Sequence, residues 1–376
     1  MVRLPNNLVQ KLQQREQNNA LRILPSPPQN IDFSSNDYLG LAQNELLFHE
    51  VHQVLLTQQK KYNGATGSRL LTGNHALYTE TETFLAQFHQ AEAALIFNSG
   101  YDANIGFFSS VLQRNDVVLY DEFCHASIRD GIQMSRAKSY KFKHNDLKDL
   151  EKLLQKESAS PGSTVYVVTE TVFSMDGDTP NLTEMSRLIQ KHKAFFVVDE
   201  AHALGVFGQN GEGLIQHLNL QDLVFARIVT FGKALGCHGA AILGSQALQS
   251  YLVNFARSFI YTTGLAPHAV ASILIGYKFM QNAQNERDQL FKNILCFKEN
   301  FPKSLQRIDS NSSIQSIVFP GNSNVKAASR RLSENGFDVK PILYPTVPEG
   351  QERLRFCLHS FNTENQIKEA LVLLSR

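Results

Sequence analysis

Between residues 75 and 245, short apolar runs alternate with segments of helical periodicity, and this alternation constrains the fold more than any other feature. The predicted strands are residues 93–97, 116–121, 163–170, 194–200 and 226–231, and the last one leads into Ala-Ala-Ile-Leu-Gly-Ser. Strands that are apolar throughout and separated by helices are typical of a mostly parallel sheet covered on both faces. The sequence therefore predicts an α/β fold, in which ligands collect beyond the carboxyl ends of the strands.

The 376 residues exceed what one compact core usually takes, so a large domain and a smaller one are expected. Residues 1–44 are predicted to form an N-terminal arm that contains a polar helix, and residues 45–275 the large domain. From about residue 276 the pattern changes to a long polar helix followed by short strands and two further helices. Residues 276–376 are therefore predicted to form a small C-terminal α+β domain.

The composition excludes several classes of function. Lys and Arg total 36 against 35 Asp and Glu, and this balance gives no reason to expect a nucleic-acid or membrane partner. The four cysteines are far apart and form no C-x-x-C pair, which argues against structural zinc and a disulfide framework. No metal site is expected. The polar N-terminus lacks the apolar core of a signal peptide, and no stretch approaches the roughly 18 apolar residues of a membrane span. A cytoplasmic protein with reduced thiols is expected.

Polar residues that could carry chemistry follow several of the predicted strands. Lys233 lies in Thr-Phe-Gly-Lys at the end of one strand, where its amine could bind a cofactor aldehyde and Thr230 could bind a phosphate. Asp199 ends a very apolar run, and a buried carboxylate is costly unless it is paired, for example with a protonated pyridine ring. His202 follows in Asp-Glu-Ala-His and could contact the ring's phenolic oxygen.

Three further segments follow strands in the same way. Ser99-Gly100-Tyr101 opens a predicted helix, whose N-terminal amides would bind an anion. His125 could stack on a cofactor ring, and Ser174 could donate a hydrogen bond to it. Each of these residues alone also has an ordinary structural explanation. Lys233 could be a solvated loop lysine, Asp199 could cap the next segment, and His125 could be structural. The segments of Ser99 and Ser174 could be simple turns.

The order of these segments along the chain is more informative than any one of them. Pyridoxal phosphate needs a lysine, an acidic partner for its ring nitrogen and donors for its phosphate. A phosphate loop, a stacking histidine, an Asp-x-x-His pair and a lysine at strand ends supply that set in succession. The sequence therefore predicts a pyridoxal-phosphate enzyme.

The chain also resembles the α-oxoamine synthases, a family of fold-type I pyridoxal-phosphate enzymes, over nearly its whole length. Three motifs are the most specific for the family: Phe-Ser-Ser-Asn-Asp-Tyr-Leu-Gly-Leu, Phe-Ser-Met-Asp-Gly-Asp and Asp-Glu-Ala-His-x-x-Gly. The segments that carry the resemblance are residues 33–41, 64–74, 97–104, 125–131, 142–146, 168–178, 197–208, 229–241 and 344–356.

The resemblance implies a role for each matching residue. Lys233 would form the Schiff base, Asp199 would pair with the ring nitrogen, and His125 would stack on the ring and help with substrate. His202 and Ser174 would contact the phenolic oxygen. The residues implied for the phosphate are Gly100, Tyr101 and Thr230, and those implied for substrate are Arg22, Asn36, Thr346 and Arg355. Arg355 suits a substrate carboxylate because a guanidinium pairs with it through two parallel hydrogen bonds.

Within the family, the chain is most similar to the biotin-pathway branch. This likeness implies a decarboxylative condensation of L-alanine with a pimeloyl thioester, carried on CoA or on an acyl carrier protein. A glycine C-acetyltransferase, another family member and a catalytically silent binding subunit are the alternatives. The resemblance also implies a homodimer, in which Thr262 or Thr263 reaches the neighbour's phosphate. The chain departs from the family at Gly264-Leu265-Ala266-Pro267, where two prolines are usual, and at Tyr78, where a histidine is expected nearby.

Overall fold

The computed structural model describes residues 3–24, 29–60, 62–157, 162 and 164–375, and it divides into two compact units. The large unit comprises Asn36–Ser174 and Thr179–Arg287. The small unit comprises Met1–Ser35, Met175–Asp178 and Asp288–Arg376.

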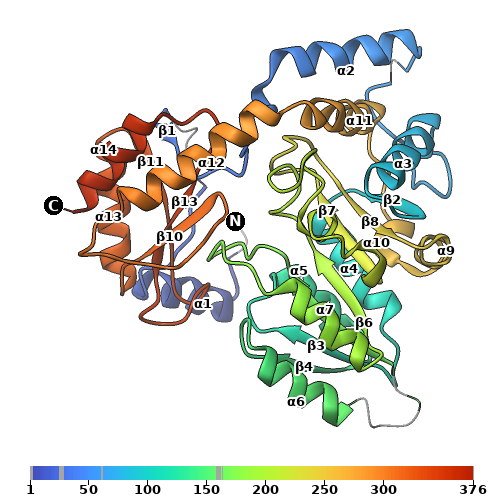
Figure 1. Ribbon diagram of the computed structural model, residues 1–376, viewed down its shortest axis with the longest axis horizontal. Helices are drawn as coiled ribbons and strands as arrows, with labels where there is room; N and C mark the ends of the chain where they lie inside the picture. Colours follow the sequence, from blue (N-terminus) through green and yellow to red (C-terminus); the bar gives the residue numbers. More distant parts are fainter. Residues whose placement is uncertain (1–2, 25–28, 61, 158–161, 163, 376) are drawn as a thin grey trace. The chain divides into compact units, whose positions relative to one another are not determined.

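A seven-stranded sheet in the order β2-β8-β7-β6-β5-β3-β4 forms the centre of the large unit (Figure 1). β8 runs antiparallel to both of its neighbours, and the other neighbouring pairs are parallel. The strands are β2 (Ala93–Phe97), β3 (Val117–Asp121), β4 (Lys138–Phe142), β5 (Val165–Glu170), β6 (Phe195–Asp199), β7 (Ala226–Thr230) and β8 (Ala240–Gly244). The predicted α/β class with a mostly parallel sheet is confirmed. The five predicted strands are β2, β3, β5, β6 and β7; residue 163 lies outside the described residues.

Helices cover both faces of this sheet, as its uniformly apolar strands require. Alternate strand residues enter two separate cores: Val197 belongs to the core that contains α4, α5 and α9, and Val198 to the core that contains α6, α7 and α8. The helices of the large unit are α2 (Glu45–Thr57), α3 (Ala76–Phe88), α4 (Gly100–Val111), α5 (Ala126–Met134), α6 (Leu147–Glu157), α7 (Leu182–Lys191), α8 (Leu214–His217), α9 (Gln246–Phe255), α10 (Arg257–Ile260) and α11 (Pro267–Gln281).

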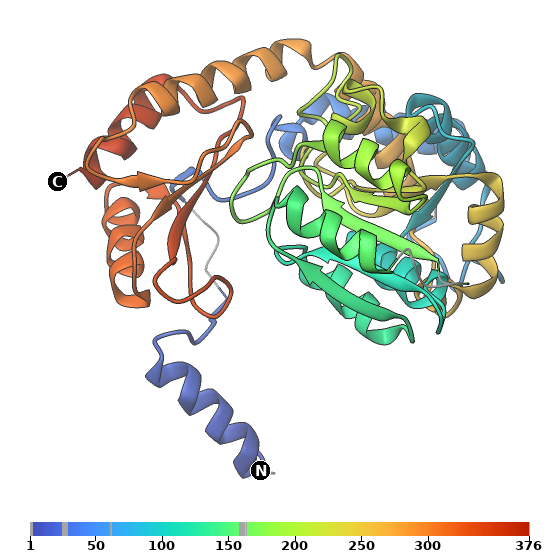
Figure 2. The same cartoon turned by 60° about the horizontal axis from the view of Figure 1, so that its bottom comes forward.

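The small unit is built on the four-stranded antiparallel sheet β12-β13-β10-β9 (Figure 1). α13 lies against this sheet, and α1, which buries none of its residues, projects away from it (Figure 2). The strands are β9 (Gln306–Arg307), β10 (Ile314–Val318), β12 (Lys340–Ile342) and β13 (Arg353–Cys357), with β1 (Ile31–Asp32) and β11 (Phe337–Asp338) as a separate parallel pair. The helices are α1 (Asn6–Gln17), α12 (Gln284–Glu299), which begins in the large unit, α13 (Asn322–Glu334) and α14 (Glu364–Leu374).

The segment Met175–Asp178, from one of the family motifs, is held firmly within the small unit. The buried Asp176 carboxylate forms an ion pair with Arg353, and the Ser310 hydroxyl donates to the Gly177 carbonyl (2.8 Å). Gly177 has a φ of 75°, and a Cβ atom there would collide with the Ile314 carbonyl oxygen. Only glycine suits this position, because it combines positive φ with a close backbone approach.

The prediction of a single long polar helix from residue 276 is wrong, because two helices, α11 and α12, span this region. α11 is apolar and has buried residues as far as Met280, whereas α12 is polar. The helical conformation is interrupted between them at Asn282 and Ala283. The domain boundaries after residues 44 and 275 stay predictions. Among the described residues, no helix is both long enough and apolar enough to cross a membrane.

Candidate active site

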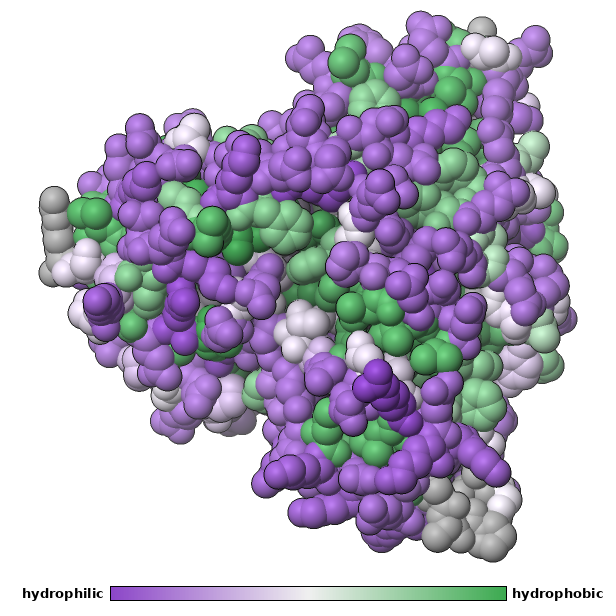
Figure 3. Space-filling view, viewed as in Figure 1, coloured by the Kyte–Doolittle hydropathy of each residue, from purple (hydrophilic) through white to green (hydrophobic). Residues whose placement is uncertain are grey.

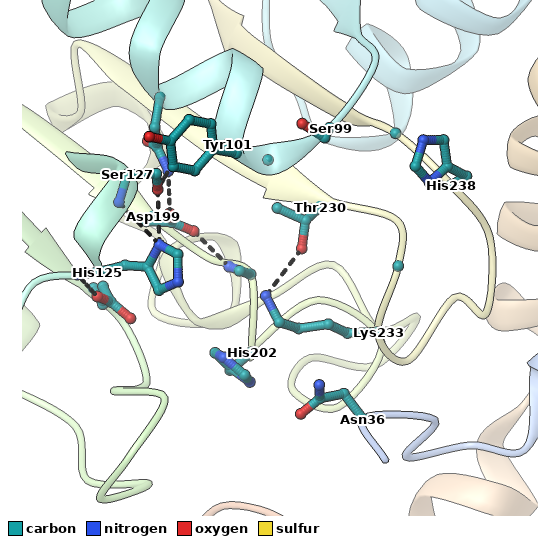
Figure 4. Close-up of a pocket in the computed structure, with 16 residues that line it drawn as sticks. Asn36, Ser99, Tyr101, His125, Ser127, Asp199, His202, Thr230, Lys233 and His238 are labelled. Carbon is teal, nitrogen blue, oxygen red and sulfur yellow. Dashed lines mark hydrogen bonds between the residues drawn. The ribbon is translucent and has the colours of Figure 1, made fainter. Parts of the chain in front are cut away.

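A pocket of about 240 Å³ opens in the large unit where strands β5, β6 and β7 end (Figure 4). Its walls come from the N-termini of α4 and α5, from the last residue of β5 and from the loops that follow β6 and β7. Lys233, Asp199 and His125 point toward a common space in this pocket. The position agrees with the general rule that ligands bind at the carboxyl ends of strands in such sheets. The lining residues are Asn36, Ser99, Gly100, Tyr101, Asn104, His125, Ser127, Glu170, Asp199, Ala201, His202, Thr230, Gly232, Lys233, His238 and Gly239.

The N-terminus of α4 forms one end of the pocket. Ser99 caps this helix, with its hydroxyl oxygen accepting from the Asp102 amide at 3.0 Å, so the first turn is fixed at the end of β2. A Cβ atom on Gly100 would lie 2.5 Å from Cγ2 of Thr230, so only glycine allows β7 to lie this close. Backbone amides at such a helix N-terminus bind anions.

Lys233 lies in the loop after β7, three residues beyond Thr230. Its Nζ donates to the Thr230 hydroxyl oxygen at 3.4 Å, and its side chain is partly buried. The Lys233 carbonyl accepts from the Gly236 amide at 2.8 Å, which makes a tight turn of the loop. The structure thus brings Lys233 and Thr230 together in the pocket, as the sequence predicts.

Asp199 ends β6 and is 5% exposed. Its Oδ1 accepts from the Ala201 amide (2.9 Å) and its Oδ2 from the Asn104 side-chain amide (3.0 Å). In the described part of the chain, no cation lies within ion-pair distance of this carboxylate. A buried carboxylate with two neutral donors still lacks a charged partner, so a cationic ligand group would be strongly favoured here.

His125 is linked to Asp199 by a short chain of hydrogen bonds through Ser127 and Asn104. Its Nδ1 accepts from the Ser127 amide (3.2 Å) and lies 2.8 Å from the Ser127 hydroxyl, which itself accepts from Asn104 (3.0 Å). Burial lowers the pKa of His125 and outweighs Asp199, which raises it. The imidazole is therefore held neutral, with Nδ1 as an acceptor.

His202 is positioned by hydrogen bonding to the segment 33–41. Its Nδ1 lies 2.7 Å from the Tyr38 hydroxyl, and that hydroxyl donates to the Asn36 side-chain oxygen at 3.1 Å. His202 is 4% exposed. Asn36, Tyr38 and His202 therefore form a chain from the segment 33–41 to the end of β6, and two of the three line the pocket.

Five polar side chains of this arrangement were not predicted from the sequence. Tyr38, Asn104, Ser127 and Glu170 lie inside motifs of the family resemblance, which was the only signal available for them. His238 follows Lys233 by five residues, and a titratable residue so close to the lysine was a signal that could have been used. These residues are Tyr38, Asn104, Ser127, Glu170 and His238.

Other predicted residues lie outside the lining of the pocket. Ser174 is partly buried beyond β5 and is not one of the lining residues. Arg22, Thr346 and Arg355 belong to the small unit; Arg22 and Thr346 are exposed, and Arg355 is buried in β13 opposite Ser316 and Lys340. Their roles stay predictions.

The two departures from the family pattern meet in the structure. The Tyr78 hydroxyl accepts from the Leu265 amide at 2.6 Å, and the Arg69 guanidinium lies 3.7 Å from the Tyr78 ring centre. The Gly264 amide donates to the Gly67 carbonyl at 3.0 Å, so segment 64–74 and segment 262–267 are joined. Asn98 donates to the Thr262 hydroxyl oxygen at 3.2 Å, which ties the joined loops to the N-terminus of α4.

Comparisons with known proteins identify the family of the chain. The family model described as aminotransferase class I and II matches residues 28–374. The chain is 39% identical to the 8-amino-7-oxononanoate synthase of Emericella nidulans, over 97% of this chain and 93% of that protein. It is also 39% identical to a putative 8-amino-7-oxononanoate synthase of Geobacillus kaustophilus, over 96% and 92% of the two chains.

Solved structures agree as well. The 8-amino-7-oxononanoate synthase of Francisella tularensis has a TM-score of 0.79 and 31% identity, and covers 92% of this chain and 97% of its own. A serine palmitoyltransferase variant from S. paucimobilis, solved with a bound PLP–myriocin aldimine, has a TM-score of 0.89 and 25% identity, covering 98% and 96%. The chain therefore belongs to the aminotransferase class I and II family of enzymes and, within it, to the α-oxoamine synthases.

Proposed function

We propose that this chain is a pyridoxal-phosphate-dependent 8-amino-7-oxononanoate synthase. It would condense L-alanine with a pimeloyl thioester and release carbon dioxide and the free thiol, a step of biotin biosynthesis. The observation that carries the proposal is one pocket that holds the Lys233 amine, the buried Asp199 carboxylate and the N-terminus of α4. The curated relatives named above supply the choice of substrates.

The pocket fits the three functional parts of pyridoxal phosphate. The α4 N-terminus and the Thr230 hydroxyl suit the phosphate, with Gly100 and Tyr101 beside it. The Asp199 carboxylate, which has no cation within ion-pair distance among the described residues, suits a protonated ring nitrogen. The Lys233 amine suits the aldehyde.

When bound, the cofactor accepts the electron pair that remains when the Cα proton of the amino acid leaves. Lys233 takes that proton as general base and returns a proton to the product carbon. The negative charge of Asp199 would keep the ring nitrogen protonated, and Asn104 and the Ala201 amide orient this carboxylate. The neutral imidazole of His125 would lie against the ring, and His202 would donate to the phenolic oxygen. Ser174, which does not line the pocket, is the second donor predicted from the family resemblance.

Arg355 and Thr346 of the small unit and Asn36 of the large unit are the further residues that this proposal assigns to the substrate. Arg355 would bind the alanine carboxylate. Arg22 would pair with the distal carboxylate of the pimeloyl chain. An acyl carrier protein or CoA would carry that chain, and the protein would act in the cytoplasm.

The enzyme would work as a homodimer with its sites at the interface. Apolar side chains gather among polar ones over α2 at the top of Figure 3. Leu46 and Phe48 on this helix are 70% and 60% exposed, and Leu71, in the segment 64–74, is 81% exposed. Exposed apolar side chains of this size are typical of surfaces that another chain covers.

A crossed assay tests the proposal. Alanine, glycine and serine are each combined with pimeloyl-CoA, acetyl-CoA and palmitoyl-CoA, and carbon dioxide and the amino ketone product are measured. Alanine with pimeloyl-CoA should give the highest kcat/KM. Preference for glycine with acetyl-CoA would make the chain a glycine C-acetyltransferase, and no turnover with any pair would favour a silent binding subunit.

A further inference from the structure

Glu170 is a second buried carboxyl group in the pocket, and the proposed chemistry assigns it no task. It ends β5 and is 2% exposed, and it lines the pocket with Asp199. The two residues are register partners in the parallel pair β5–β6. Side chains of register partners point to the same face, and neighbouring strands lie about 4.8 Å apart. Two carboxyl groups are therefore adjacent in one largely buried space.

The two carboxyl groups differ in the number of hydrogen bonds that they accept. Asp199 accepts from Ala201 and Asn104, one donor on each oxygen. Glu170 accepts on Oε1 from the backbone amide of His125, at 2.5 Å. Two adjacent buried carboxylates do not both ionise readily, and the one with fewer donors holds the proton more strongly. The arrangement therefore leaves Asp199 as the anion.

The groups around Glu170 act in both directions, and those that favour its protonated form have the larger effect. Burial raises the pKa of Glu170 well above the usual carboxyl range, and Asp199 on β6 raises it further. Asp121, at the end of β3, acts in the same direction. The His125 amide and the Lys233 amine beyond β7 lower it by less.

We propose that Glu170 is a positioning residue of the site: a protonated carboxyl group that fixes the backbone at His125 and leaves Asp199 the only carboxylate in the pocket. His125 is the N-cap of α5. A hydrogen bond to its amide therefore fixes the position from which the imidazole projects and the direction of the first turn of α5. The role of Asp199 rests on the proposed function, whereas the protonation of Glu170 and its hold on His125 do not.

Infrared spectroscopy of the full chain, with and without pyridoxal phosphate, tests the protonation directly. The C=O stretching band of a protonated carboxyl group should be present at pH 7 and should disappear in Glu170→Gln. In Asp199→Asn the band should titrate at lower pH, because the neighbouring negative charge is gone. Absence of the band at pH 7, or an unchanged titration in Asp199→Asn, would overturn the assignment.

Two variants test the hold on His125. Glu170→Gln cannot ionise but keeps a carbonyl oxygen for the His125 amide, whereas Glu170→Ala removes the acceptor. In apoprotein labelled with ¹³C-histidine, the His125 resonance should keep its position in Glu170→Gln and shift in Glu170→Ala. Equal shifts in both variants would show that the ionised carboxylate is needed and would refute the proposal. Should Glu170→Ala fail to fold, the glutamine variant and the infrared band still decide. Neither measurement involves the acyl donor, so a wrong substrate assignment would leave this result standing.

Discussion

At the scale of single residues, Lys233 is the side chain on which the chemistry depends most directly. Lys233→Ala should abolish turnover, while the variant still folds and still binds pyridoxal phosphate non-covalently, because the α4 N-terminus and Asp199 are unchanged. Borohydride reduction of the parent protein followed by peptide mapping locates the covalent linkage. A label on any other lysine would end the assignment.

Asp199 should control how readily the Cα proton is lost. Asp199→Asn keeps the shape and can keep one of the two hydrogen bonds, from Asn104 or from the Ala201 amide, but removes the charge that would hold the ring nitrogen protonated. A charge-assisted hydrogen bond is worth about 1.5–3 kcal/mol, so exchange of the alanine α-proton should slow by roughly 10- to 150-fold. Exchange into heavy water, followed by NMR, measures this rate. An unchanged rate would show that Asp199 does not have this role.

The residues that could be predicted from the sequence share one property. Asp199 is the last residue of an apolar strand, and Lys233 and Gly100 each lie three residues beyond one; the carboxyl ends of parallel strands meet at one edge of a sheet. Asn104 lies within a helix, and Glu170 reads as the last residue of a strand. Their roles depend on neighbours far along the chain, Asp199 and His125, which no local pattern reveals.

At the scale of elements, the strand end that carries Asp199 is braced from the opposite face of the sheet. Glu200, 0% exposed, pairs with Arg227 on β7 at 2.6 Å, and its other oxygen accepts from the Ile215 amide at 2.9 Å. Alternating side chains thus place Asp199 in the pocket and Glu200 in a buried ion pair. The sequence showed the alternation but not the distant arginine partner.

Breaking this ion pair should destabilise the large unit. Glu200→Gln leaves the buried Arg227 charge uncompensated, and removing one partner of a buried pair costs about 3–5 kcal/mol of the free energy of unfolding. Urea unfolding followed by circular dichroism measures the loss. The matched control is Glu151→Gln, which breaks an ion pair with Lys191 on the surface and should leave the unfolding midpoint nearly unchanged. Equal effects of the two variants would contradict the prediction.

At the scale of the whole molecule, the sequence predicted the α/β class and two-part organisation more readily than the details of connection. The segment Met175–Asp178 leaves the large unit and belongs to the small one, which no periodicity indicates. Its reason is specific: the Asp176 pair with Arg353 and the close approach at Gly177 join residues about 140 to 180 positions apart.

The association of two copies is the first prediction at this scale. Leu46→Asp combined with Phe48→Asp places charges at two exposed apolar positions of α2, so it should convert an active dimer to monomers with low activity. Light scattering at assay concentration measures the mass. Lys152→Asp, on the polar helix α6, is the control and should remain dimeric. An active monomeric parent protein would refute the dimer.

The choice of substrates is the last prediction. A pocket contact with the alanine methyl group is worth about 1–3 kcal/mol, so alanine should be preferred over glycine by roughly 10- to 200-fold. The distal carboxylate of the pimeloyl chain offers more, because an arginine built to pair with it is left unpaired by a plain acyl chain. Arg22→Ala should therefore raise the KM for pimeloyl-CoA and change that for an uncharged acyl-CoA little, while Arg3→Ala, also an exposed arginine near the N-terminus, should change neither. If Arg22→Ala raises the KM for both donors equally, Arg22 contacts the carrier rather than the distal carboxylate. The preference for a pimeloyl chain must then come from another residue.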